Sequence, residues 1–174
     1  MKSLLAGLSA AILLVAAVSA SSRPSPSGGE RQPSLFSPPR EVWLYGHIRS
    51  VTRTGARYEL RFDPAWWLGG TTANRAAVED GRIKPGEVVP NDYYVRDETR
   101  RVLTYRVAAA ARATVVTAGS AGLRSTAVPL SELDRLLDGD NPRRRRLLVP
   151  VRRAGFWIRV AVDTIRSLDQ QYQP

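Results

Sequence analysis

The chain has 174 residues, of which 26 are lysine or arginine and 16 are aspartate or glutamate, so its formal net charge is +10. Lys2 and Lys84 are the only lysines, so arginine carries almost all of the positive charge. The absence of cysteine excludes disulfide bonds, a thiol nucleophile, zinc ribbons and iron–sulfur clusters. The single histidine, His47, excludes metal sites built from several histidines. The length suits one domain of ordinary size with an additional segment.

Residues 1–20 have the pattern of a secretory signal peptide. Lys2 provides the positive start, residues 4–18 form a nearly unbroken apolar run, and residues 18–20 (VSA) form a cleavage site after Ala20. A membrane-spanning helix needs about 20 apolar residues, so this run is short for one. We expect a cleaved signal, no transmembrane segment in the mature protein, and a secreted or envelope-associated location. A retained N-terminal anchor is the alternative.

Residues 21–41 are rich in serine, proline and glycine, which is typical of a disordered linker. We therefore expect residues 42–174 to form a single β-rich domain.

Alternating and β-branched segments in that domain predict short strands at residues 42–51, 57–63, 91–96, 102–107, 113–117, 156–162 and 165–168. The first two segments are predicted to pair as a hairpin, and residues 91–96 are predicted to pair with 102–107. Two short helices are expected, one after Thr71 or Thr72 and one beginning at Ser131 with a leucine stripe. The fold class is therefore mainly β, a single small antiparallel β-barrel or strongly bent sheet of six to seven strands with two short helices.

Residues 141–162 contain seven arginines and no acidic residue. Such a segment attracts phosphates, carboxylates and anionic polymers. We favour the other explanation, a solvated loop in an arginine-biased composition, and keep anion binding as the alternative. The candidate anion-binding residues are Arg143, Arg144, Arg145, Arg146, Arg152 and Arg153. An anionic envelope polymer or a membrane surface would be the partner, and export argues against nucleic acid.

Catalytic motifs are sparse. A carboxylate pair drawn from Asp63, Glu79, Asp80 and Asp92 could act as a glycosidase does, although we favour turn formation and pairing with arginines as the roles of these acids. The chain has no nucleophile-elbow motif to supply a serine for a catalytic triad with His47. No residue pattern indicates a metal or another cofactor.

Trp66 and Trp67 follow the second predicted strand directly. Such a pair could plug one end of a barrel, because aromatic side chains dominate cores. The other interpretation is a platform on which sugars stack. We expect the plug.

The strings at residues 62–70 (FDPAWWLGG), 76–81 (AAVEDG) and 89–96 (VPNDYYVR) resemble motifs of a family of exported actinobacterial proteins, with more distant lipoprotein-like relatives in bacilli. The resemblance covers residues 45–174 and implies an envelope or secreted location, but the family has no established activity to carry over. Many of its members carry a lipid-modified cysteine, which this chain lacks. The motif positions without an assigned role are Asp63, Trp66, Trp67, Glu79, Asp80, Asn91, Asp92, Tyr93 and Tyr94.

Together these features predict a secreted, non-enzymatic binding or accessory module of the bacterial envelope, taken to be monomeric. The alternatives are a carboxylate-dependent hydrolase of an envelope glycan and a binder of anionic polymer or lipid that uses the Arg143–Arg153 segment.

Overall fold

The computed structural model describes residues 41–97 and 101–174. The predicted signal peptide and nearly all of the predicted linker therefore lie outside the described residues. The elements, in chain order, are β1 (Val42–Thr54), β2 (Arg57–Gly69), α1 (Gly70–Glu79), the 3-10 turn η1 (Pro90–Asp92), β3 (Tyr93–Arg96), β4 (Leu103–Gly119), β5 (Gly122–Val128), α2 (Leu130–Leu137), the 3-10 turn η2 (Val151–Arg153), β6 (Gly155–Ala161) and β7 (Thr164–Gln170).

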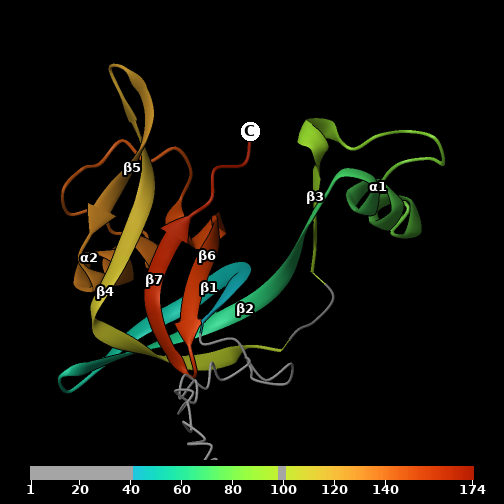
Figure 1. Ribbon diagram of the computed structural model, residues 1–174. Coiled ribbons are helices and arrows are strands. Elements are labelled where there is room, and N and C mark those ends of the chain that lie inside the picture. The colour runs from blue at the N-terminus through green and yellow to red at the C-terminus, as the bar shows by residue number, and fades with distance from the viewer. Residues whose placement is uncertain (1–40, 98–100) are drawn as a thin grey trace, which may run out of the picture. The chain divides into compact units, whose positions relative to one another are not determined.

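Five of these strands close into a barrel, in the order β1-β2-β4-β7-β6 and back to β1 (Figure 1). Its neighbouring strands are antiparallel except for β4 and β7, which are parallel. The predicted class, a mainly β protein with a small barrel and two short helices, is confirmed, and the barrel is mixed rather than purely antiparallel. With α2 inserted between its third and fourth strands, the barrel has the strand order of the OB-fold, an architecture that by itself assigns no ligand.

The barrel interior is filled by alternate residues of its strands. Phe62 of β2 and Phe156 of β6 are the largest fully buried side chains among the described residues. The leucine stripe of α2 packs onto the same core, as the sequence pattern predicts. The helix begins one residue earlier than expected: Pro129 is its N-cap, and Ser131 does not cap it.

β2 is longer than predicted, because Asp63 and Pro64 do not end it. Residues 58–62 of β2 pair with β4, and residues 66–69 pair with β3. Pro64 falls between these two partners, where a strand tolerates a residue without an N–H group. The predicted hairpin of residues 91–96 with 102–107 is therefore wrong, since both segments pair with β2 instead.

The end of β2 carries an extension made of α1, η1 and β3, which projects from the barrel (Figure 1). It has a small core of its own, formed by Ala73, Ala77 and Val89 with Leu68, Ile83 and Tyr94 packed against them. The extension places β3 beside the last residues of β2, and this position shapes the site described below.

β4 is a single strand of 17 residues where the sequence indicated two short strands joined by an alanine-rich link. Its second half pairs with β5, which the sequence pattern did not predict. Over residues 41–97 and 101–174, neither helix has the length and apolar character that crossing a bilayer requires.

Candidate functional site

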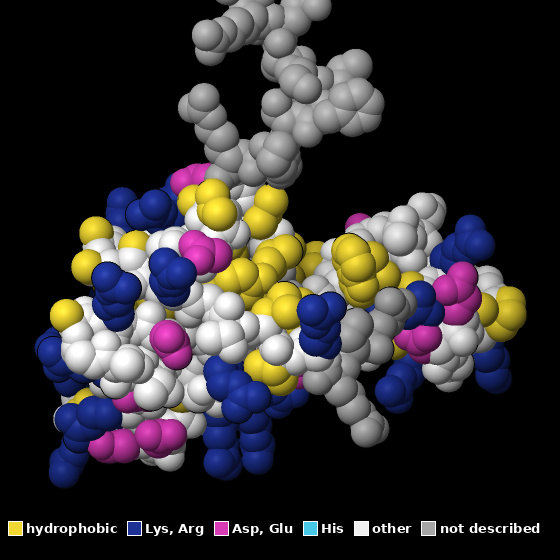
Figure 2. All heavy atoms as spheres, turned by 90° about the horizontal axis from the view of Figure 1, so that it is seen from below, with side chains coloured by type: hydrophobic (Ala, Val, Ile, Leu, Met, Phe, Trp, Pro, Cys, Tyr) yellow, Lys and Arg dark blue, Asp and Glu magenta, His cyan; other side chains and the backbone are white. Residues whose placement is uncertain are grey.

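All four tryptophans of the chain line one pocket on the outer face of the barrel, with a volume of about 310 Å³. Alternation along β1 points Val42, Leu44 and Ile48 inward, so Trp43 and Tyr45 face outward. Trp157 lies directly opposite Tyr45 on β6. The remaining lining residues are Leu44, Pro64, Ala65, Trp66 and Trp67. Figure 2 shows hydrophobic side chains gathered between the barrel and the part that carries α1.

The inner wall of this tryptophan pocket is a set of interlocked rings. Tyr45 makes edge-to-face contacts with Trp67 and Trp157, with ring centroids 5.0 and 5.2 Å apart. Trp67 also stacks on Tyr93 of β3, with the ring centroids 4.3 Å apart and the planes 6° from parallel. These contacts fix the ring orientations, as aromatic clusters with complementary edges and faces do.

The outer wall of the pocket is open to solvent. Trp43 is 55% exposed and Trp66 is 60% exposed, although both are large apolar side chains. Exposed aromatic surface next to a preformed hollow is characteristic of a site that receives a ligand. The expectation that Trp66 and Trp67 plug a barrel end is therefore wrong: they lie within β2, on the outside of the barrel.

The C-terminal residues pack against the inner rings and satisfy their polar groups. Gln173 Nε2 donates a hydrogen bond to Tyr45 Oη, and Trp157 Nε1 donates to Gln171 Oε1 at 3.1 Å. Burial, reinforced by the neighbouring Tyr93, raises the pKa of Tyr45 to about 12. Tyr45 is therefore neutral at physiological pH and can serve as a structural hub rather than as a base.

The other motif positions of the extension hold it together. Arg96 donates to Asp80 at 2.6 Å and to Glu79 at 3.1 Å, and Tyr94 Oη donates to Asp80 at 2.9 Å. The Arg96 guanidinium lowers the pKa of both carboxyl groups. Asn91 and Asp92 form a turn in which both residues have positive φ.

Three of the four carboxylates considered for a hydrolase are engaged by arginines, and the fourth, Asp92, lies in the η1 turn. Asp63 is buried on β2 and ion-paired with Arg49, while Glu79 and Asp80 share Arg96 in the extension. His47 lies 3.3 Å from the carbonyl oxygen of Ala154. Among the described residues, no group of three or more histidine or acidic side chains could hold a metal ion.

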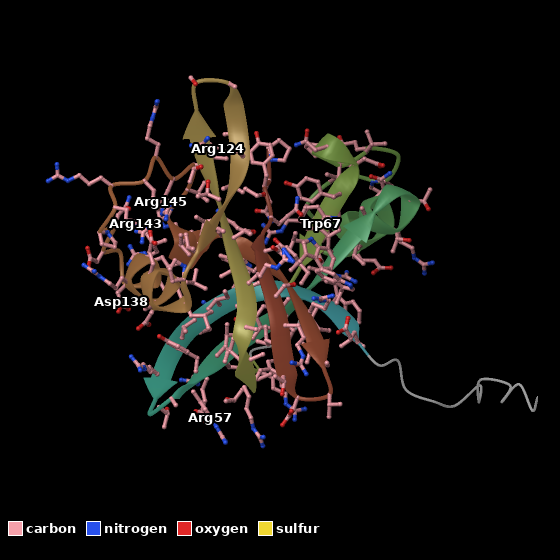
Figure 3. All side chains as sticks on the ribbon, turned by 60° about the vertical axis from the view of Figure 1, so that its left-hand side comes forward. Arg57, Trp67, Arg124, Asp138, Arg143 and Arg145 are labelled. Atoms are coloured by element: carbon pink, nitrogen blue, oxygen red, sulfur yellow. The ribbon has the colours of Figure 1, made fainter. Side chains whose placement is uncertain are left out.

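The arginine run has a partly structural role. Arg145 contacts Glu132 of α2 through two nitrogens, at 2.5 and 3.1 Å, and Arg143 contacts the same carboxylate at 3.3 Å. Arg144, Arg146, Arg152 and Arg153 are exposed. Figure 3 shows Arg143 and Arg145 beside α2, well apart from Trp67, so the run and the tryptophan pocket are separate places on the molecule.

Trp43, Tyr45 and Trp157 are members of the site that the sequence did not predict. The available signal was the alternation that places Trp43 and Tyr45 on one face of β1 and Trp157 on the outer face of β6. Only the pairing of β1 with β6 brings the two faces together. Comparison with protein-family models, curated proteins and solved structures finds no match for this chain.

Proposed function

We propose that this protein is an exported, non-enzymatic binding module of the bacterial envelope that holds a glycan chain against its tryptophan pocket. The observation that carries the proposal is the convergence of all four tryptophans on one outward-facing hollow, with two of them largely exposed. The secretory pattern of residues 1–20 supports a partner outside the cytoplasm.

The chemistry of the pocket suits a saccharide. A sugar ring presents one face of C–H groups that packs on an indole ring, while its hydroxyl groups remain in water. Trp43 and Trp66 offer such exposed rings, and the interlocked Tyr45, Trp67 and Trp157 keep the hollow formed without a ligand. Because the aromatic side chains are already held in place, binding loses less side-chain conformational entropy.

The hydrolase and arginine-run alternatives have less support. Asp63, Glu79 and Asp80 are each engaged by an arginine, and two members of the run are committed to Glu132. Binding of a saccharide to the tryptophan pocket leaves all of these ion pairs intact.

The test is binding to purified cell-wall polysaccharide, followed by intrinsic tryptophan fluorescence. Because every tryptophan of the chain lines the pocket, a change in emission reports on the pocket and its immediate surroundings. We expect Trp66→Ala to weaken binding about tenfold or more, because truncating an aromatic anchor commonly costs over about 1 kcal/mol.

Leu123→Ala is the matched control, since Leu123 is also a large exposed apolar side chain but lies on β5, outside the pocket. Its binding should equal that of the unaltered chain. Equal affinity of the Trp66→Ala variant and the unaltered chain for the polysaccharide would contradict the proposal.

A further inference from the structure

A second hollow, with a volume of about 380 Å³, lies on the outer face of the same barrel, over β4, β6 and β7. Trp43 lines both this hollow and the tryptophan pocket, so the two sites adjoin. The Arg159 guanidinium lies 5.9 Å from the centre of the Trp43 ring, and Arg159 is the cross-strand neighbour of Trp43. The ring of Trp43 therefore lies at the boundary between the two hollows.

The space exists because β4 arches away from β7. The register places Val107 opposite Ile165 and Arg112 opposite Ser167, so residues 108–111 of β4 oppose Arg166 alone. These four residues are all alanine, and three of them line the hollow. Their small side chains leave the space empty.

Positive charge dominates this arginine hollow. Arg112, Arg159 and Arg166 line it, against a single acid, Asp169, which already accepts a hydrogen bond from Thr114 Oγ1 at 2.9 Å. Within residues 41–97 and 101–174, Arg159 has one ion pair, with Glu41 at 3.4 Å, while Arg112 and Arg166 form none. Three cations around one concave surface attract an anion.

Two buried donors in the hollow have no partner. Arg159 Nε and Ser167 Oγ are inaccessible to solvent and form no hydrogen bond, although Arg159 and Ser167 are direct neighbours across β6 and β7. Ser167 as a whole is only 9% exposed. Buried polar groups almost always have a partner, so these two groups leave hydrogen-bonding capacity unused at the base of the hollow, next to the guanidinium groups of Arg112 and Arg166.

We infer that the arginine hollow is a subsite for an anionic group, a carboxylate or a phosphate, carried by the glycan that stacks in the tryptophan pocket. The inference rests on the proposed function and narrows the ligand to an acidic polysaccharide. Guanidinium groups match both anions, since their paired N–H donors fit two oxygens at once. The inference places the anion subsite at Arg112, Arg159 and Arg166, apart from the Arg143–Arg153 segment.

The experiment compares three soluble probes: an oligogalacturonate, which carries carboxylates; a teichoic acid, which carries phosphates; and a neutral glucose oligomer. Tryptophan fluorescence titration gives each affinity. The Arg112→Gln/Arg166→Gln double variant should bind the better of the two acidic probes about tenfold more weakly. It should bind the neutral oligomer as the unaltered chain does.

Arg57→Gln/Arg124→Gln is the control, because it removes the same charge from exposed residues that lie outside both hollows (Figure 3). Added salt should weaken binding of the acidic probe to the unaltered chain. The same salt should weaken its binding to the Arg112→Gln/Arg166→Gln variant much less. Both double variants change exposed side chains only, so both are expected to fold as the unaltered chain does.

The outcomes separate the two proposals. Equal affinity for neutral and acidic probes, or equal losses in the two double variants, would overturn the anionic subsite and leave the glycan proposal standing. Failure of every saccharide probe to bind would overturn both. A thymidine oligonucleotide is titrated as a fourth probe, and its binding alone would also overturn both proposals, in favour of a single-stranded nucleic acid.

Discussion

Gly155 is the residue on which the packing of the inner aromatic wall depends most directly. It begins β6, and a Cβ atom at this position would overlap the Tyr45 side chain. Tyr45 in turn contacts Trp67 and Trp157, so a displaced Tyr45 moves the whole wall. The absence of one methyl group thus sets the position of three rings.

We expect Gly155→Ala to lower the free energy of unfolding by about 1–3 kcal/mol, as overpacking of a filled site does. The near-ultraviolet circular dichroism of the tryptophans should change as well. Gly69→Ala is the control, because a Cβ there meets only the Asp92 carbonyl oxygen at an ordinary 3.8 Å. Urea unfolding of both variants checks the prediction, and equal stability losses would refute it.

At the scale of elements, the loop after α2 is held to that helix by one carboxylate. Glu132 is buried on α2, and Arg145 reaches it from the loop with two hydrogen bonds. The amide of Asn141 and the backbone of Arg145 close the same loop with two further bonds of 2.8 Å each. Arg145, which the sequence suggested as an anion-binding residue, therefore anchors the loop to α2.

Arg145→Gln should lower the free energy of unfolding at pH 7 by about 2 kcal/mol, because it removes charged hydrogen bonds from a buried carboxylate. Arg144→Gln removes the same charge from an exposed neighbour and should change stability by less than about 0.5 kcal/mol. Urea unfolding distinguishes the two, and similar values would show that Arg145 is not an anchor.

The same pair predicts a pH dependence. Arg145 lowers the pKa of Glu132 in the folded chain. The pair therefore stabilises the fold fully above the ordinary glutamate pKa of about 4.3, and this contribution is lost as the pH falls through the lowered value. The stability difference between the unaltered chain and Arg145→Gln should accordingly shrink between pH 7 and pH 3, and a constant difference would contradict the assignment.

At the scale of the described domain, two hydrophobic cores of unequal size are joined by β2. The barrel core includes the strand interiors and α2, whereas the described residues of the extension bury Ala73, Ala76, Ala77 and Val89 and no larger apolar side chain. The extension relies in addition on the Arg96 contacts with Glu79 and Asp80. It should therefore open more readily than the barrel, since local stability follows buried apolar contact.

Arg96→Gln should speed hydrogen exchange of the backbone amides in α1 and β3 and leave those of β6 and β7 unchanged. Arg75→Gln is the control, because Arg75 has an exposed ion pair with Glu79 but none with Asp80. Mass-spectrometric exchange reads both regions at once. Uniform acceleration across the barrel would mean that the two cores open together.

Local patterns predicted much of the fold. Alternation in residues 57–63 and 156–162 indicated strands, and the leucine stripe after Ser131 indicated a helix packed on the core; all three are present. These features depend on which face of a single element is apolar. The partner of residues 91–96 was predicted wrongly, because strand pairing depends on contacts between distant segments that no local pattern encodes.

The candidate sites show the same division. The sequence by itself determined the mainly β class, the two helices, and which tryptophan and arginine side chains are present. Only the tertiary structure decided that Trp43, Trp66, Trp67 and Trp157 share one pocket, and that Arg112, Arg159 and Arg166 line the hollow beside it. The physical reason is closure of the barrel: strands far apart in the chain become neighbours, and their outward faces join into one surface.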